Sequence, residues 1–143
     1  MIRFRSSCFV PLHALLLVLL WFAGPAARAA VEIQQWTLAN GARVSFVETH
    51  ALPIVDVQID FSAGAAYAPA GKAGLAGMVA GLLDAGTEAL DENALADRFA
   101  DVGAEFGASA ETDRASVSVR TLSSEAERTT AIQLLASVLR APR

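Results

Sequence analysis

Cysteine and histidine are scarce in this chain, and each scarcity excludes a class of protein. The single cysteine among 143 residues is Cys8, so the chain cannot form an internal disulfide framework. Of the two histidines, His13 lies in the same N-terminal stretch as Cys8, which leaves His50 as the one imidazole of residues 31–143. One histidine cannot supply a site that needs two imidazole ligands.

Residues 1–30 have the three parts of a secretory signal peptide. Arg3 and Arg5 give a positive start, an apolar stretch runs from Phe9 to Ala23, and Ala27-Arg28-Ala29 gives a small-x-small cleavage pattern. The alternative is an uncleaved membrane anchor, but the apolar stretch falls short of the ~20 residues that span a bilayer. We therefore expect export to the periplasm or the extracellular space, with no membrane span after cleavage.

Without this leader the chain is acidic. Three of its eleven Lys and Arg residues lie in the leader, so eight remain against fifteen Asp and Glu. Nucleic-acid binding rests on clustered Lys and Arg. We therefore expect no nucleic-acid partner.

Residues 31–143 alternate between strand-like and helix-like hydrophobic periods, in the order β-β-β-α-α-β-β-α. Two signals are clear for the strands: Asn40-Gly41 favours a tight hairpin turn, and residues 54–61 alternate apolar with polar side chains. The expected strands are 32–38, 42–47, 54–61, 104–110 and 115–121, and the expected helices are 75–83, 92–102 and 124–139.

Local signals mark where two of the helices begin. Asp91 is a good N-cap, and Leu90 and Leu95 stand at the positions of a hydrophobic staple. Ser124 and Glu127 have the spacing of a capping box. The expected apolar faces are Leu95, Phe99 and Val102 in the first of these helices, which stops at Gly103, and Ile132, Leu135 and Leu139 in the second.

This order of elements predicts an α+β fold, a mainly antiparallel sheet with helices packed on one face. The helical spacing of apolar residues in the last expected helix continues to Leu139, four residues before Arg143. We therefore expect residues 31–143 to be the N-terminal part of a truncated domain.

Three stretches carry a resemblance to a known family. Thr37–Val44 resembles the opening pattern T-L-x-N-G-x-x-V, Phe61–Ala76 resembles a strand and loop that end in G-x-A-G-L-A, and Gly86-Thr87 follows at the expected distance. Together they resemble the insulinase/pitrilysin zinc metallopeptidases, which include the mitochondrial processing peptidases. The resemblance implies an α/β sandwich of the insulinase-like type, of which this chain is the first part of one domain.

Active members of that family continue from G-L-A into H-x-x-E-H, whose histidines hold zinc and whose glutamate activates the bound water. Here the same five positions read Gly77-Met78-Val79-Ala80-Gly81. The resemblance thus implies a member with no catalytic residue and no metal of its own, since the degenerate positions are Gly77, Ala80 and Gly81. The two glycines have another interpretation: they would let the helix approach the sheet closely, at ~1 kcal/mol each in helix propensity.

Two other features of the sequence contain residue types that can bind metals. His50 lies in a polar stretch, Glu48-Thr49-His50, that is typical of a solvated loop. The acidic cluster Asp84, Glu88, Asp91 and Glu92 lacks the spacing of an EF-hand loop. We expect no metal at either place.

The resemblance implies a non-catalytic subunit or half that pairs with a zinc-bearing family member and helps to enclose unfolded peptides. Zinc is expected only in that partner. In active members an edge strand pairs with the peptide backbone, and its counterpart here would use Phe106, Gly107, Ala108 and Ser109. The alternative is that this is an ordinary core or edge strand.

Two further functions stay open. The chain is also consistent with a fragment of a zinc metalloendopeptidase whose active site lies in another domain after Arg143. It is consistent, finally, with a structural assembly subunit, although export through a cleaved signal weighs against that role.

Overall fold

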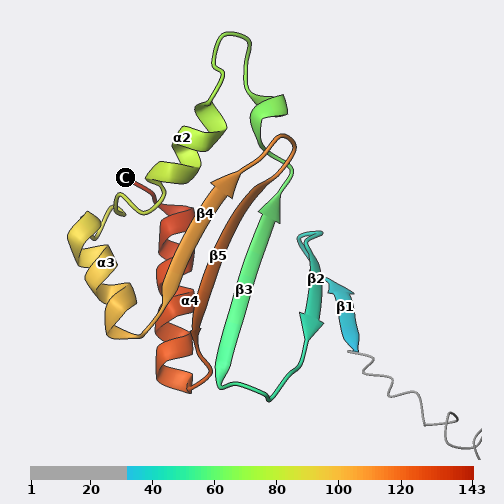
Figure 1. Ribbon diagram of the computed structural model, residues 1–143, viewed down its shortest axis with the longest axis vertical. Helices are drawn as coiled ribbons and strands as arrows, with labels where there is room; N and C mark the ends of the chain where they lie inside the picture. The colour runs from blue at the N-terminus through green and yellow to red at the C-terminus, as the bar shows by residue number, and fades with distance from the viewer. Residues whose placement is uncertain (1–31) are drawn as a thin grey trace, which may run out of the picture. The chain divides into compact units, whose positions relative to one another are not determined.

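The computed structural model describes residues 32–143, so the predicted signal peptide lies outside the described residues. The chain divides into two compact units, one ending at Glu48 and the other beginning at Thr49, which are described separately (Figure 1). In the described range, no helix combines the length and the apolarity that a membrane crossing requires.

The first unit contributes an antiparallel hairpin made of β1 (Ile33–Thr37) and β2 (Arg43–Val47). Gly41 adopts a φ of 85°, and the Asn40 side-chain oxygen accepts a hydrogen bond from the Ala42 amide at 3.1 Å. Both features depend on the residue types that predicted a turn here, since Asn and Gly tolerate tight turns. The hairpin prediction is confirmed.

The second unit is built on a three-stranded antiparallel sheet made of β3 (Ile54–Phe61), β4 (Glu105–Ala110) and β5 (Ala115–Leu122). The strand order is β3-β5-β4, which places β5 in the centre. Val57 of β3 and Phe106 of β4 both pair with Val119 of β5. This row of apolar side chains faces the helices, because alternate residues of a strand share one face.

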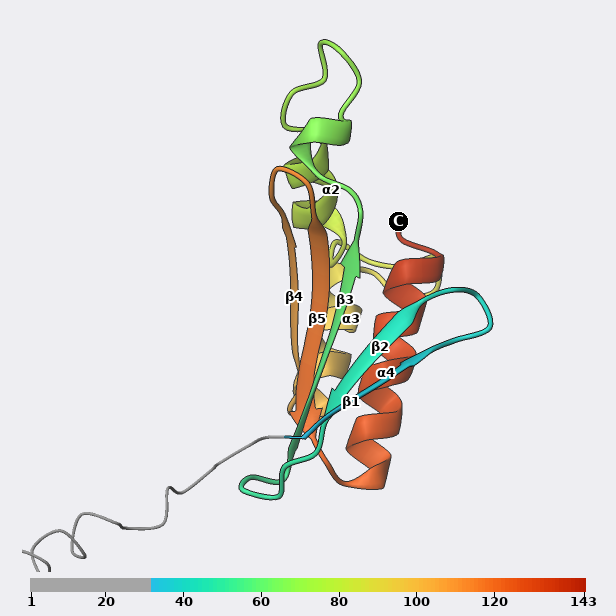
Figure 2. The same cartoon turned by 90° about the vertical axis from the view of Figure 1, so that its right-hand side faces the viewer.

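Helices α3 (Glu92–Asp101) and α4 (Glu125–Arg140) cover one face of this sheet (Figure 2). The α+β fold predicted from the sequence, with antiparallel strands and helices on one face, is therefore confirmed. The core between sheet and helices consists of Leu95, Phe99, Val117, Val119, Ala131, Leu135 and Val138.

Helix α3 begins as the sequence predicted. The Asp91 side chain accepts a hydrogen bond from the Ala94 amide at 2.8 Å, and Leu95 and Phe99 are buried. Gly103 ends the helical segment with a φ of 58°. The N-cap, the buried apolar residues and the glycine at the end all agree with the sequence prediction. Residues close together in the sequence therefore determine this helix.

Two predictions for α4 were wrong in detail. Ile132 is 43% exposed, and the buried stripe is Ala131, Leu135 and Val138, because the helix turns these residues toward β5. The Ser124 hydroxyl donates to the Glu127 carboxylate at 2.5 Å and does not cap the backbone. That hydrogen bond lowers the pKa of Glu127.

Between β3 and α3 lie a short 3₁₀ helix, η1 (Ala65–Tyr67), and helix α2 (Leu75–Leu82). The sequence predicted α2 almost to the residue but gave no signal for η1, which lies in the loop of small residues after β3. Apart from η1, the predicted order of elements is confirmed.

Candidate functional site

Helix α2 has side chains that are hydrogen, hydrocarbon or thioether throughout, in the sequence LAGMVAGL. It therefore offers neither nitrogen nor oxygen from a side chain, and a zinc ion would find no hard or imidazole ligand along it. Of its residues, only Ala80 is buried. Gly77 and Gly81 are exposed on the helix, four residues apart.

The glycines of α2 are not there to permit a close approach. A Cβ atom built on Gly77 or on Gly81 would have no atom within 4 Å. The interpretation that these glycines let the helix approach the sheet is therefore wrong, because the side of α2 that turns inward carries Ala80. A methyl group would fit at both positions.

The N-terminal approach to α2 is tied to the β4–β5 turn by Gly64. Its φ is 139°, and a Cβ at this position would lie 2.5 Å from the Glu111 carbonyl oxygen. The next two amides, of Ala65 and Ala66, donate to the carbonyls of Glu111 and Thr112 at 2.9 and 2.7 Å. Only glycine allows the two backbones to meet so closely.

The C-terminal end of α2 is tied down by Gly86, the glycine of the predicted Gly86-Thr87 pair. Its φ is 129°, and a Cβ would lie 2.8 Å from the Leu90 carbonyl oxygen. The Thr87 amide donates to that same carbonyl at 2.7 Å, and the Arg143 amide donates to the carbonyl of Gly86 at 3.1 Å. This junction joins α2, α3 and the segment that follows α4.

Strand β4 holds all four of the residues predicted to bind peptide. It lies at an edge of the three-stranded sheet and pairs with β5 on one side, while α2 contacts it near its end (Figure 1). Phe106 and Ala108 pack against the core, and the ring of Phe106 stacks on Phe99 with centroids 5.6 Å apart. Gly107 pairs with Ser118, and Ser109 is exposed.

Two of these four side chains therefore serve the core, and a peptide added to β4 would be held by main-chain hydrogen bonds. The geometry is compatible with both interpretations of the strand, as a peptide-binding edge and as an ordinary edge. Peptide binding at β4 stays a prediction.

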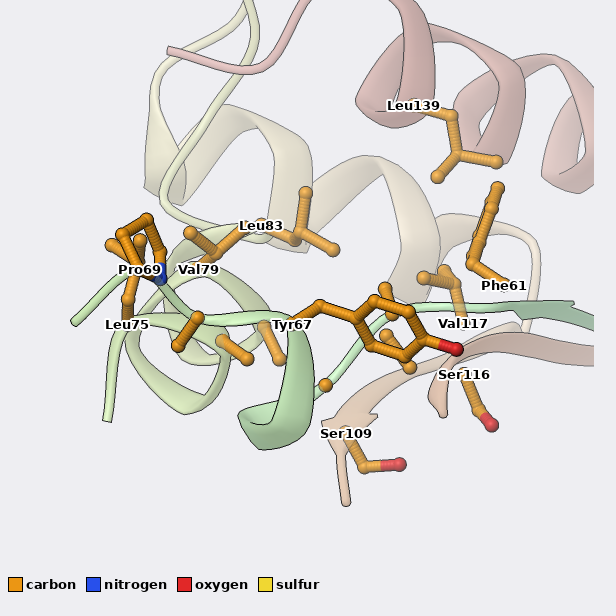
Figure 3. Close-up of a pocket in the computed structure, with 16 residues that line it drawn as sticks. Phe61, Tyr67, Pro69, Leu75, Val79, Leu83, Ser109, Ser116, Val117 and Leu139 are labelled. Carbon is orange, nitrogen blue, oxygen red and sulfur yellow. The ribbon is translucent and has the colours of Figure 1, made fainter. Parts of the chain in front are cut away.

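An apolar cleft of about 400 Å³ lies between α2, the segment that follows β3, and the sheet (Figure 3). The end of α4 also contributes to its wall through Leu139. Its bulky lining residues are Phe61, Tyr67, Leu75, Val79, Leu83 and Leu139. Sequence reasoning missed this cleft, because its walls come from segments far apart in the chain.

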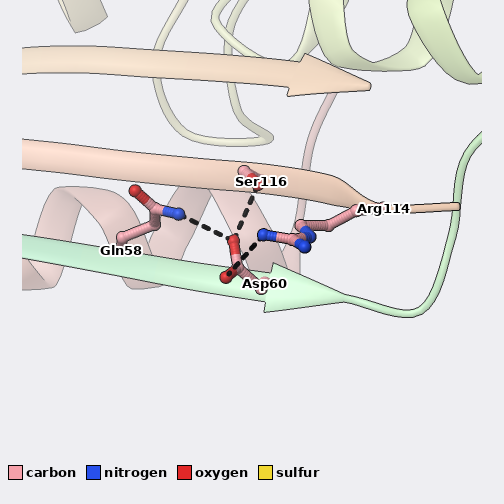
Figure 4. A network of polar contacts seen from close by, with 4 residues as sticks. All are labelled: Gln58, Asp60, Arg114 and Ser116. Carbon is pink, nitrogen blue, oxygen red and sulfur yellow. Dashed lines mark hydrogen bonds and ion pairs between the residues drawn. The ribbon is translucent and has the colours of Figure 1, made fainter. Parts of the chain in front are cut away.

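The opposite face of the sheet is polar. Asp60 accepts hydrogen bonds from Ser116 at 2.7 Å and from Gln58 at 2.9 Å, and Arg114 lies 3.9 Å away (Figure 4). The bond from Ser116, and then that from Gln58, lowers the pKa of Asp60. The alternation of residues 54–61 predicted this wet face, and the strand register supplies the partners.

A second pair on the same face joins Asp56 to Arg120, with Oδ1 and Nε 2.6 Å apart. This hydrogen bond lowers the pKa of Asp56 and raises that of Arg120. Both side chains are more than half exposed. The arrangement is that of a solvated sheet face.

In the part of the chain that the structure describes, no group of three or more His, Cys, Asp or Glu side chains could hold a metal ion. His50 lies outside the helices and strands and is exposed. In the acidic cluster, Asp91 serves as the N-cap of α3, as predicted.

Comparisons with known proteins place this arrangement in a family. The family model described as Insulinase (Peptidase family M16) matches residues 43–143. A search of the curated proteins found no match.

The solved structures that resemble the chain include the following two. One is a peptidase M16 inactive domain from Pseudomonas fluorescens, which is 36% identical, with a TM-score of 0.74 over 78% of this chain. The other, a protease from Helicobacter pylori, is 21% identical, with a TM-score of 0.68 over 80% of this chain, and supports the fold alone.

The chain spans 27% of the length of each of these two structures. It corresponds to part of the domains that it resembles, and its structure is homologous to a region of an M16 domain described as inactive. From the match over residues 43–143, the chain belongs to the insulinase family, peptidase family M16.

Proposed function

We propose that this chain is a non-catalytic member of the M16 family. The observation that carries the proposal is the composition of α2 at the three positions that correspond to H-x-x-E-H. By the resemblance to the family's motif, Gly77 and Gly81 take the positions of the zinc ligands and Ala80 that of the general base, and all three lie on α2. None of the three can donate a lone pair to a metal or take a proton from water.

Its role is to pair with a zinc-bearing M16 subunit or domain and to form part of the wall around an unfolded peptide. The 36% identical relative is itself described as an inactive domain, which supports a role other than catalysis for this sequence. Strand β4 supports peptide contact, because an edge strand presents unpaired main-chain groups to an extended chain.

The pairing takes place outside the cytoplasm. The support is the order of charges, apolar residues and small residues in positions 1–30, which is that of a cleaved export signal. The zinc-bearing partner is then an exported protein too.

The first experiment measures zinc content and peptide hydrolysis of the purified chain. We expect substoichiometric zinc and no hydrolysis that a chelator can inhibit. Stoichiometric zinc together with chelator-sensitive cleavage would show a peptidase, and the proposal would be abandoned. The control is a zinc-bearing M16 peptidase with an intact H-x-x-E-H motif, handled in the same way.

The second experiment tests the pairing. The chain is co-expressed with a tagged, zinc-bearing M16 protein from the same source and purified through the tag. We expect a complex that stays associated at micromolar concentration. It should hydrolyse peptides faster than the zinc-bearing protein does alone. No association at that concentration argues against a partner subunit.

The open space on α2 allows a gain-of-binding test. The double variant Gly77→His/Gly81→His restores two imidazoles at i and i+4 on the exposed side of the helix. It should bind Zn²⁺ at least about tenfold more tightly than Gly77→His alone, because the second ligand binds intramolecularly. Equal affinities, measured by competition with a chromophoric chelator, would mean that these positions do not face a common point.

A further inference from the structure

The turn of the β1–β2 hairpin contains an asparagine followed by a glycine, Asn40-Gly41, and both residues are exposed. In such a pair the glycine main-chain nitrogen can attack the side-chain amide carbon of the asparagine, because glycine has no Cβ to obstruct the approach. The attack forms a C–N bond, closes a succinimide ring and releases ammonia. Water then opens the ring at either carbonyl and leaves aspartate or isoaspartate at position 40.

Two hydrogen bonds of the turn act on this reaction in opposite directions. The Ala42 amide donates to the Asn40 side-chain oxygen at 3.1 Å, where it would stabilise the negative charge that develops during the attack. The Gly41 amide, whose nitrogen is the nucleophile, donates to the Leu38 carbonyl at 2.9 Å. That nitrogen must lose its proton before it attacks, so the second bond blocks the first step, as it blocks hydrogen exchange. The closed turn is therefore unreactive.

The strands that keep the turn closed are largely exposed. Every residue of β1 and β2 is exposed except Val44, which is partly buried. Trp36 and Phe46 make a ring contact across the hairpin, with centroids 6.5 Å apart. A two-stranded hairpin is marginally stable by itself, and segments with few buried apolar contacts open at a low cost in free energy. The hairpin should therefore open often while the second unit stays folded.

We propose that Asn40 is a site of spontaneous deamidation in the folded protein, and that opening of the β1–β2 hairpin sets the rate. Opening releases the Gly41 amide from the Leu38 carbonyl and lets its nitrogen reach the Asn40 side chain. The reaction needs water and hydroxide alone. This inference does not depend on the proposed function.

The two products affect the hairpin differently. Aspartate at position 40 keeps the original main chain and a side-chain oxygen that can accept from the Ala42 amide. Isoaspartate carries the main chain through the former side chain, which adds a methylene group to the turn. The Leu38 amide then loses its position against the Ala42 carbonyl, to which it donates at 2.8 Å. Formation of isoaspartate is thus an irreversible change that prevents the hairpin from closing.

The first experiment incubates the full chain in mildly alkaline buffer, with and without urea, and follows deamidation by mass spectrometry of peptides. Asn40 should react at least about tenfold more slowly in the folded chain than in urea, as expected for a group that reacts only on local opening. It should still react faster than Asn93, an exposed asparagine of α3 that alanine follows. Equal rates with and without urea, or a folded-state rate no higher than that of Asn93, would overturn the proposal.

A pair of variants tests the role of the hairpin. Trp36→Ala removes the ring contact across the strands and should raise the folded-state rate about threefold, without changing the rate in urea. Tyr67→Ala is the matched control, because it removes an exposed aromatic side chain outside the hairpin and should leave the rate at Asn40 unchanged. A rate that Trp36→Ala does not alter, or that both variants raise equally, contradicts control by the hairpin.

Hydrogen exchange of the Gly41 amide gives a readout that needs no variant. Its protection factor should equal the factor by which folding slows deamidation, because both reactions require the same opening. Protection much larger than the slowing of deamidation would mean that the reaction proceeds in the closed turn. An unprotected amide would mean that the bond to the Leu38 carbonyl does not restrain it, and either result rejects the proposal.

Discussion

Helices α2 and α3 follow one another in the chain, but different interactions hold them in place: side-chain contacts hold α3, and backbone contacts of the flanking segments hold α2. Helix α3 has a side-chain cap, a buried apolar stripe and a polar outer face. Helix α2 has no side-chain cap and buries one alanine, and its neighbouring segments are anchored by backbone hydrogen bonds at Gly64 and Gly86. A helix held by its flanks is free to present its own side chains to another part of a protein.

The comparison also relates to function. In α3 the buried side chains, Leu95 and Phe99, pack in the core against the sheet. In α2, Gly77 and Gly81 face open space, so packing within the described residues does not require glycine at either position. Under the proposed function, these two glycines stand where zinc-bearing members of the family carry histidine.

The largest expected difference between the helices is in how much one leucine of each contributes to the free energy of unfolding. Leu95 of α3 is 1% exposed, so Leu95→Ala should lower the free energy of unfolding by about 2–5 kcal/mol through lost burial and a cavity. Leu82→Ala in α2 should change it by less than about 0.5 kcal/mol, as for a surface residue. Urea denaturation of both variants checks this, and similar losses would mean that α2 is packed as α3 is.

The glycines that flank α2 should differ sharply from those within it. Gly86→Ala places a Cβ against the Leu90 carbonyl at a φ of 129°, and should cost about 2 kcal/mol or more. Gly81→Ala meets open space in a helix, and should raise the free energy of unfolding by about 0.5–1 kcal/mol. Thermal unfolding distinguishes them, and a stable Gly86→Ala would refute the role of the anchor.

The smallest expected effect concerns the cap that α3 has and α2 lacks. Asp91→Ala removes the acceptor of the Ala94 amide, and should cost about 1 kcal/mol. Asp97→Ala, an exposed site on the same helix, should cost less than about 0.5 kcal/mol. Equal losses for the two variants, measured by denaturation at neutral pH, would mean that the cap adds nothing to α3.

Elements with strong local signals were predicted well. Residues 54–61 alternate apolar with polar side chains and form β3 with those bounds, and Asp91 and Gly103 delimit α3 as expected. Each of these signals depends on neighbours within a few residues in sequence. The resemblance to the insulinase family was likewise carried by short motifs, and the family match confirms it.

The candidate site was predicted less completely. The sequence shows that Gly77, Ala80 and Gly81 carry no side chain that could bind a metal, but whether Gly77 and Gly81 face a packed backbone or open space depends on contacts with distant segments. The side of α4 that is buried depended in the same way on how that helix lies against β5, so Ile132 was misassigned.

The sequence by itself therefore determined the order of elements, the turns and caps that bound them, and the absence of ligand-bearing side chains along α2. The tertiary structure alone decided that η1 docks on the β4–β5 turn, that Gly86 fits against Leu90, and that an apolar cleft opens beside α2. The physical reason is range: turns, caps and periodicity are set by residues close in sequence, whereas steric fit and exposure depend on segments that meet only when the chain has folded.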